Sequence, residues 1–199
     1  MCESIIAMQN AEMPEKRRRP VKITIPVDLR RLYKSRTLRN FALVLNVGAD
    51  PRYGEWTLAE LCRTISHQLL ANAIPQNMAG QITANVEPQR VIALRLAPLG
   101  LKTFVMDQVY RKSGEGGGCI NISNLGNLAL PGEMSPFVER AEFIIGPQRS
   151  YPNNCSVLSF NGKTCINMIR NIQESELERR FFSRLVELGI AVDIESNRR

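Results

Sequence analysis

Apolar residues recur at intervals of three and four along several stretches of the chain, which predicts amphipathic helices. The clearest stretch ends before Pro75 and begins with a capping box, in which the side chains of Thr57 and Glu60 satisfy free amides of the first turn. A second capping box is predicted at Ser175 and Glu178, and Gly189 ends the helix that follows it. The predicted helices are 4–13, 57–74, 88–96, 98–112 and 175–188.

Period-two alternation predicts strands, most of them in the last third of the chain. Residues 21–25 alternate and Pro26 is expected to end that strand, whereas 38–47 is apolar on both faces and predicts a buried strand. Asn161 and Gly162 suit a two-residue type I′ hairpin, because both residues adopt positive φ readily. The other predicted strands are 119–122, 140–145, 156–160, 163–169 and 191–194.

Strands mixed with long helices predict an α/β (α+β) two-layer sandwich, in which helices cover a mixed, mostly antiparallel sheet. The apolar stripe of the helix at 98–112, formed by Leu101, Phe104, Val105 and Val109, is expected to pack in the core. The glycine-rich segment 113–118 is expected to be a flexible linker. The expected organisation is an N-terminal helix with a basic connector at 1–19, a lobe at 20–195 and a tail at 196–199.

Composition favours a soluble globular protein, since 44% of the 199 residues are apolar and 23% are charged. No apolar stretch approaches the roughly 20 residues that a bilayer requires. The first ten residues also lack the charged start and long apolar middle of a signal peptide. The sequence therefore predicts a cytoplasmic protein with no membrane partner.

The net charge of +7 is concentrated at six positions, the run 16–19 and the final two residues. Without these six positions, 20 basic residues face 19 acidic ones. A nucleic-acid-binding module usually carries its basic residues on one face or on a recognition helix. We therefore interpret the run 16–19 as a solvated connector and expect no nucleic-acid partner, with a phosphate-binding patch as the alternative.

The sequence offers little catalytic chemistry of its own. Its five cysteines include no Cys-x-x-Cys pair, so we predict buried free thiols and no metal site. His67, the only histidine, falls inside a predicted helix, where a structural role is favoured over a catalytic one. The glycines at 116–118 precede a strand, whereas a phosphate-binding loop opens a helix. No residue is assigned a catalytic role.

Three segments occur in an order that resembles a known superfamily. They are ITIPVDLR at 23–30, RNFALVL at 39–45 and INISNLG at 120–126, which is followed by Leu130 and Pro131. This order resembles the second half of the chloramphenicol-acetyltransferase-like superfamily, which includes peptide-synthetase condensation domains and CoA-dependent acyltransferases. The chain is most similar to bacterial alcohol acetyltransferase-like proteins, although Arg39 stands where many relatives have glycine.

The resemblance implies a pseudo-dimeric enzyme with two similar lobes and a substrate tunnel between them. The catalytic signature His-His-x-x-x-Asp-Gly belongs to the first lobe, and this sequence does not contain it. The chain is therefore expected to be the C-terminal lobe, to be inactive alone, and to need a missing N-terminal lobe as its partner. Acyl-CoA, or an acyl-carrier thioester, would be the co-substrate of the intact protein, beside a small-molecule acceptor and with no tightly bound cofactor.

By position in the resemblance, Ser123, Asn124 and Gly126 are expected to line the tunnel wall, and Arg30 and Asn40 to brace the lobe. A donor at Ser123 or Asn124 could face a developing oxyanion, and a local turn is the alternative for these residues. Three other functions stay open, namely a condensation-type lobe acting on carrier-protein thioesters, a noncatalytic scaffold, and a small nucleic-acid-binding protein, which would depend on residues 16–19 alone. An exposed apolar patch and self-association are also predicted.

Overall fold

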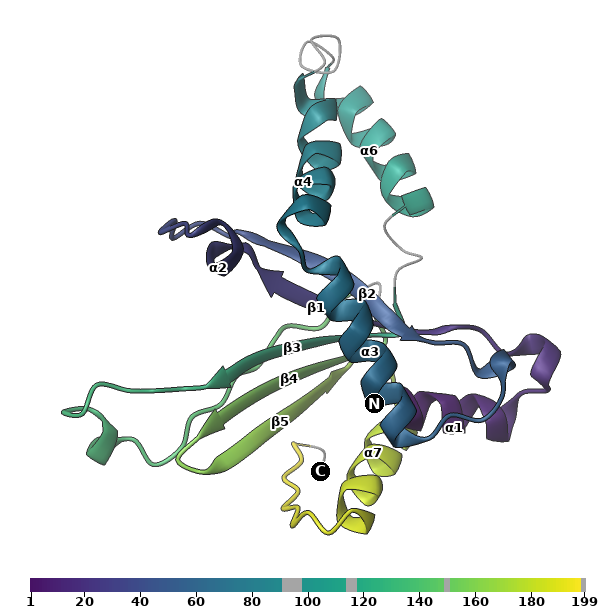
Figure 1. The fold of residues 1–199 in the computed structure, drawn as a ribbon, viewed down its shortest axis with the longest axis vertical. Coiled ribbons are helices and arrows are strands. Elements are labelled where there is room, and N and C mark those ends of the chain that lie inside the picture. The colour runs from purple at the N-terminus through teal and green to yellow at the C-terminus, as the bar shows by residue number, and fades with distance from the viewer. Residues whose placement is uncertain (91–97, 114–117, 149–150, 198–199) are drawn as a thin grey trace.

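The computed structural model describes residues 1–90, 98–113, 118–148 and 151–197. Its elements form an α/β protein with a five-stranded mixed sheet and six α-helices (Figure 1). The helices are α1 (Cys2–Glu12), α2 (Leu29–Tyr33), α3 (Leu58–Asn72), α4 (Pro75–Arg90), α6 (Leu99–Ser113) and α7 (Glu176–Glu187), with 3-10 turns η1 (Glu15–Arg17), η2 (Pro51–Tyr53) and η3 (Ser135–Phe137). The strands are β1 (Val21–Asp28), β2 (Ala42–Ala49), β3 (Ile120–Asn127), β4 (Asn153–Phe160) and β5 (Lys163–Arg170).

The strands are arranged in the order β2-β1-β3-β4-β5. The two outer pairings, β1 with β2 and β4 with β5, are antiparallel, and the two inner pairings are parallel. The mixed sheet and the α/β class are therefore confirmed. The hairpin between β4 and β5 is also confirmed, because Asn161 and Gly162 both have positive φ, at 48° and 74°.

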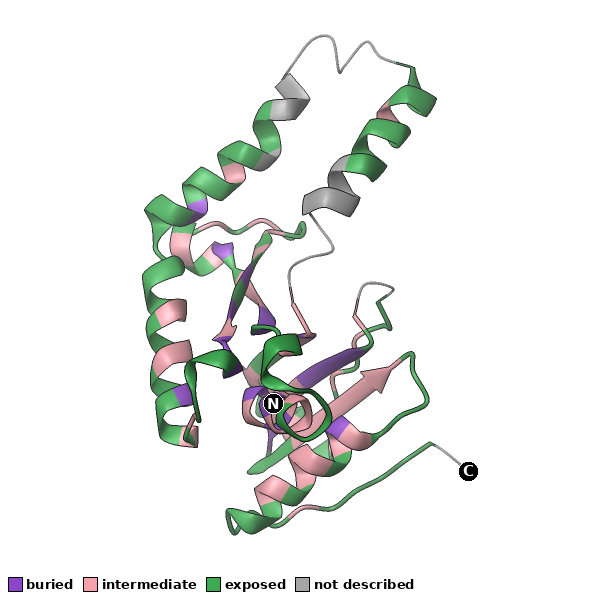
Figure 2. Cartoon of the chain, turned by 90° about the vertical axis from the view of Figure 1, so that its right-hand side faces the viewer, coloured by how far each residue is buried: buried purple, intermediate pink, exposed green. Residues whose placement is uncertain are grey.

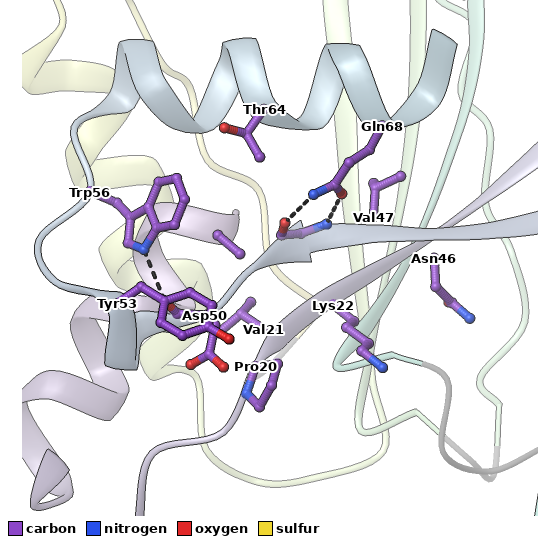
Figure 3. Close-up of a pocket in the computed structure, with 12 residues that line it drawn as sticks. Pro20, Val21, Lys22, Asn46, Val47, Asp50, Tyr53, Trp56, Thr64 and Gln68 are labelled. Atoms are coloured by element: carbon purple, nitrogen blue, oxygen red, sulfur yellow. Dashed lines mark hydrogen bonds between the residues drawn. The ribbon is translucent and has the colours of Figure 1, made fainter. Parts of the chain in front are cut away.

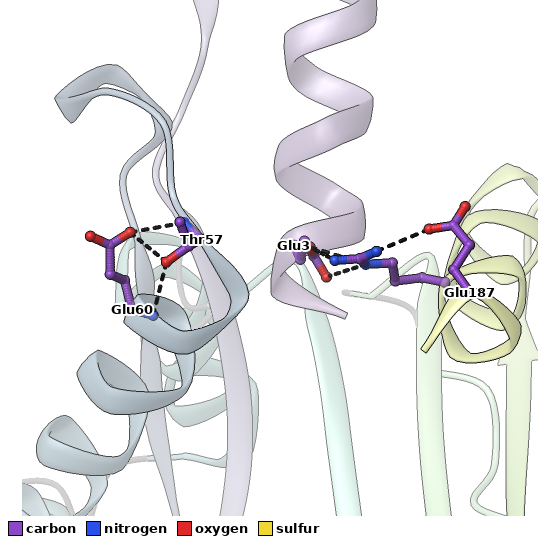
Figure 4. Close-up of polar contacts among 5 residues, drawn as sticks. Glu3, Thr57, Glu60 and Glu187 are labelled. Carbon is purple, nitrogen blue, oxygen red and sulfur yellow. Dashed lines mark hydrogen bonds and ion pairs between the residues drawn. The ribbon is translucent and has the colours of Figure 1, made fainter. Parts of the chain in front are cut away.

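Three helices, α1, α3 and α7, pack on one face of the sheet and form the main core (Figure 1). Strand residues on this face alternate with residues on the opposite face, as the pleat requires. The predicted capping box of α3 is confirmed, and Arg184 of α7 reaches Glu3 of α1 at 3.1 Å (Figure 4). The buried core residues are Cys2, Ile6, Val21, Ile23, Val47, Ala49, Leu61, Ile120, Cys155 and Leu177.

The helices α4 and α6 extend beyond the sheet as an arm (Figures 1 and 2). Met78 at the start of α4 is buried in a second cluster with Leu29 and Leu45, whereas most of the other residues of the arm whose burial is described are exposed. The predicted core stripe of α6 is wrong for its described residues, since Phe104 is 63% exposed and Leu101 is also exposed. Helical spacing identified an apolar face without identifying anything that covers it. Self-association of the chain stays a prediction.

Several predicted boundaries are wrong. The helix expected at 88–96 begins instead at Pro75 as α4, and residues 91–97 lie outside the described residues, as do 114–117 of the predicted linker. No strand forms at 191–194. The second capping box does not form: the Ser175 side chain makes no capping bond, and the Glu178 carboxylate pairs instead with Arg170 on β5 at 2.7 Å.

Both strands predicted in the first 50 residues form, but the burial of one and the end of the other were predicted wrongly. The segment expected to be a buried strand forms β2, which lies at the edge of the sheet and leaves Val44 55% exposed. Pro26 does not end β1 but pairs with Val44. The pairing of β1 with β3 stops at Thr24, so the missing N–H of Pro26 removes no bond there.

Candidate functional site

The sheet face opposite α1, α3 and α7 is polar at its centre. Because side chains alternate along each strand, the residues between the core positions of the inner strands all face this side. Register places Thr24 opposite both Asn46 and Asn121, and Asn121 opposite Asn154. A second row, formed by Ser123, Ser156 and Asn167, lies two residues further along β3 and β4. We call this set the polar face, and it comprises Asn46, Thr24, Asn121, Asn154, Ser123, Ser156 and Asn167.

On the β1 and β2 side of the first row, the side chains are hydrogen-bonded to one another. The Thr24 hydroxyl donates to Asn46 Oδ1 at 2.7 Å, and it is 3.0 Å from the Tyr151 hydroxyl. Because the single Thr24 hydroxyl proton goes to Asn46, the Tyr151 hydroxyl donates in the second bond. Thr24 Oγ1 lies where a Cβ on Gly118 would fall, so only glycine fits at that position before β3.

The other half of the first row is unsatisfied among the described residues. Asn154 is 1% exposed, and both its Oδ1 and its Nδ2 lack a hydrogen-bond partner there. Asn121 Oδ1, on the neighbouring strand at the paired position, is also buried without one. A buried polar group without a partner costs about 1–3 kcal/mol, so a pair of them marks a place where a ligand or water could bond. Two further unpaired atoms, Asn153 Oδ1 and Glu178 Oε2, belong to residues on the helix-covered side of the sheet.

The second row anchors an extended segment instead of a strand. The carbonyl oxygen of Phe143 accepts from Ser156 Oγ at 2.5 Å and from Asn167 Nδ2 at 3.0 Å. Residues 140–145 alternate between half-buried and exposed positions, as the sequence suggested, but they join no ladder, so the predicted strand is wrong. Side-chain bonds from β4 and β5 hold this segment across the polar face.

The structure separates the residues that the sequence placed together on the tunnel wall. Ser123 is half-buried on the polar face opposite Ser156. Asn124 is the next residue along β3, so it points to the opposite face, where its Oδ1 accepts from the Gly126 amide at 2.8 Å. Gly126 has φ +76° beside a register shift between Asn124 and Asn127. For Asn124 the geometry is that of a local turn.

The two residues expected to brace the lobe differ from each other. Arg30 donates to the carbonyl oxygens of Thr37 at 2.8 Å and Arg39 at 2.5 Å, and its guanidinium pairs with Asp28 at 3.0 Å. It therefore holds the loop between α2 and β2. Asn40 lies exposed at the end of that loop, where its side chain has no hydrogen bond to any described residue.

Sequence reasoning missed Thr24, Asn121 and Asn154. A signal for them exists, because inner parallel strands are buried on both faces and usually carry continuous apolar residues. Asparagines inside such strands are therefore unusual. Recognising that Asn121 and Asn154 are neighbours requires the register of β3 against β4, which a single sequence does not provide.

A second feature is a hollow at the outer edge of β2, near the start of α3 (Figure 3). Gln68 accepts from the Gly48 amide at 2.7 Å and donates to the Gly48 carbonyl at 2.9 Å, so its side chain takes the place of a neighbouring strand. The Trp56 indole donates to the Asp50 carbonyl at 3.0 Å. These bonds fix both walls of the hollow.

Neither Cys155 nor His67 supplies a nucleophile or base at the polar face. Burial raises the pKa of Cys155 to about 11, so its thiol stays protonated at neutral pH. All five cysteines are free, but Cys62 is exposed and Cys119 and Cys165 are half-buried, so the prediction of buried thiols holds only for Cys2 and Cys155. His67 is exposed on α3, which covers the other side of the sheet.

Within residues 1–90, 98–113, 118–148 and 151–197, no helix is long and apolar enough to cross a bilayer. The same residues contain no group of three or more His, Cys, Asp or Glu side chains that could hold a metal ion.

Comparison of the chain with protein-family models, with curated proteins and with solved structures finds no match.

Proposed function

We propose that this chain is the C-terminal lobe of a CoA-thioester-dependent O-acyltransferase of the alcohol acetyltransferase type. In this proposal the polar face forms one wall of the substrate tunnel. The three segments that carry the resemblance support it, because the third, at 120–126, is far from the first two in sequence, yet all three fall on or next to three neighbouring strands, β2, β1 and β3.

The observation that carries the proposal is the pair of unsatisfied asparagines at the centre of the polar face. Asn154 offers one donor and one acceptor, and Asn121 offers a further acceptor, all buried. Amide groups such as those of a pantetheine arm match this set, since each presents one N–H and one carbonyl. A donor at this depth is also worth more to a developing oxyanion than one in water.

The reaction would be transfer of an acyl group from a thioester to a hydroxyl group. The acceptor oxygen attacks the thioester carbonyl carbon, a C–O bond forms, the C–S bond breaks, and CoA leaves as the thiol. A base must take the hydroxyl proton and return it to the leaving sulfur. His67 lies on the other side of the sheet, so this base would come from a partner lobe carrying His-His-x-x-x-Asp-Gly. In this proposal the protein is cytoplasmic, where its cysteine thiols would stay reduced.

The test is an acyl-transfer assay on the intact protein whose reading frame contains this chain. Acetyl-CoA and a panel of primary alcohols are supplied, and release of the CoA thiol is followed with a thiol reagent. We expect alcohol-dependent release that falls at least tenfold in Asn154→Val. The matched variant Asn40→Val, at an exposed asparagine, should keep wild-type activity.

Two outcomes would support other functions. Transfer from a carrier-protein thioester but not from acetyl-CoA would indicate a condensation-type lobe. A folded intact protein that transfers no acyl group from either donor would indicate a noncatalytic scaffold and would refute the proposal.

A further inference from the structure

The hollow at the edge of β2 has the size and rigidity of a small-ligand site. Its volume is about 420 Å³, within the roughly 300–1,000 Å³ typical of ligand pockets. The bonds from Gln68 to Gly48 and from Trp56 to Asp50 hold its walls without help from a ligand. Its lining includes Pro20, Lys22, Asn46, Tyr53, Trp56 and Gln68 (Figure 3).

An exposed aromatic ring stands at the rim of the hollow. Tyr53 is 83% exposed, although it belongs to a well-defined turn held by Asp50 (Figure 3). A large ring held in water by a fixed turn presents a flat face on which another flat ring can stack. Nucleobases stack on such rings whatever their identity, at a gain of about 1–3 kcal/mol per base.

The segment that leads to the hollow, residues 15–22, is rich in basic residues. Pro20 lines the hollow and directly follows the basic run 16–19, and Lys22 lines it as well. Between residues 15 and 22 the sequence has five cations and one carboxylate. The described residues provide no ion-pair partner for Lys22 or for the side chains of Lys16 and Arg17, so this charge is available to a ligand.

The one carboxylate that lines the hollow does not oppose an anion strongly. Both oxygens of Asp50 accept from the guanidinium of Arg52, the first at 2.9 Å. That bonding lowers the pKa of Asp50, so it stays ionised but neutralised by its neighbour. Lys22 is therefore the charged lining residue that is left for an anion, and the basic run 16–19 directly precedes Pro20 in the chain.

We infer that the hollow binds a nucleotide, with its base stacked on Tyr53 and two or more phosphate groups held by Lys22 and the basic run 16–19. The ligand is a free nucleoside diphosphate or the nucleotide part of a CoA molecule, which share this chemistry. The second source fits the arrangement of the sheet, because Asn46 lines the hollow and also accepts from Thr24 on the polar face. The inference itself does not depend on the proposed function.

Trp56 makes the test direct, because it is the only tryptophan of the chain and lines the hollow. The full chain is excited at 295 nm, and its fluorescence is followed while ADP, adenosine 3′,5′-bisphosphate, CoA, adenosine, inorganic phosphate or single-stranded poly(A) is added. We expect saturable quenching by ADP, with adenosine and phosphate at least tenfold weaker. Tighter binding of CoA than of ADP would assign the site to CoA, and weaker binding of CoA than of ADP would assign it to free nucleotides.

Two variants and two matched controls separate this site from a general anion patch. Tyr53→Ala should weaken ADP binding at least about fivefold through lost stacking, and Lys22→Glu about tenfold or more. Phe137→Ala removes another exposed ring, 88% exposed on η3, and Lys163→Glu makes the same charge change at the far edge of the sheet. Both controls should bind ADP as the wild type does.

Three results would overturn the inference. They are no quenching by any nucleotide, binding that inorganic phosphate matches and Tyr53→Ala does not change, and tight binding of poly(A) without binding of ADP. The last result would show an RNA-binding surface. Circular dichroism of each variant checks that the chain is still folded.

Discussion

Replacing Asn154 with valine should make the protein more stable. Its side chain is 1% exposed, and neither polar atom has a partner among the described residues. Each such group costs about 1–3 kcal/mol, and the substitution removes both costs. The larger volume of the valine side chain offsets part of this gain, because overpacking a core costs about 1–3 kcal/mol. We expect a net gain of about 1–3 kcal/mol in the free energy of unfolding. At about 3 °C per kcal/mol for a chain of this length, the melting temperature should rise by roughly 3–9 °C.

Ser156→Ala provides the matched control on the same strand and the same face. Ser156 is also fully buried, but its hydroxyl donates to the Phe143 carbonyl. Losing that bond should lower the free energy of unfolding by about 1 kcal/mol. The Phe143 carbonyl keeps its bond from Asn167, so no new unpaired group is created.

Urea unfolding followed by circular dichroism measures both variants, and Asn154→Ala checks for overpacking. The two substitutions should change stability in opposite directions. If both Asn154 variants are destabilised by as much as Ser156→Ala or more, then Asn154 is hydrogen-bonded in the folded protein. In that case its role is structural, and the reasoning that makes it a ligand site fails.

Three further predictions concern the scaffold. Gly48→Ala should lower the urea midpoint of unfolding well below that of the wild type, because the new Cβ would overlap the Val21 carbonyl. Gly80→Ala, in open space on α4, should raise the free energy of unfolding by about 1 kcal/mol. Equal effects of the two substitutions would contradict this packing. The pKa of Glu176 is lowered to about 2 by Arg179 and Arg180, so its stabilising contribution is present above pH 4.5 and is lost as the pH falls from 4.5 to 2. The difference in melting temperature between wild type and Glu176→Gln should therefore shrink over that range, and a constant difference would refute it. In native alkylation mapped by mass spectrometry, exposed Cys62 should react well before buried Cys155, and the reverse order would contradict the burial of β4.

The features that the sequence predicted correctly depend on residues close together in the chain. The capping box of Thr57 and Glu60 spans four residues, and the Asn161–Gly162 turn spans two. The second capping box was wrong because a distant residue, Arg170, binds the carboxylate of Glu178. A local motif does not record such competition.

Features that depend on what covers a surface could not be predicted. The apolar face of α6 has correct helical spacing but no covering partner among the described residues. The segment 140–145 has strand-like alternation, yet side chains from β4 and β5 hold it in place of a ladder. Periodicity indicates which face is apolar and leaves its partner undetermined.

The candidate site was predicted only in part. Ser123 lies on the polar face, whereas Asn124 turns away from it by the alternation of the strand. Asn121 and Asn154 become a pair only through the parallel register of β3 and β4. The resemblance pointed to β3, and the register shows which residues of β3 and β4 are neighbours on the polar face.

Photo-crosslinking tests most directly whether the polar face forms a wall of the tunnel. An acyl-CoA with a photoreactive group on its acyl chain is bound to the intact protein, irradiated, and the labelled peptides are identified by mass spectrometry. The account predicts labels on peptides of β3 and β4, within 120–127 and 153–160, that unlabelled acyl-CoA competes away. Competed labels confined to α1, α3 or α7, which cover the opposite face, would contradict it.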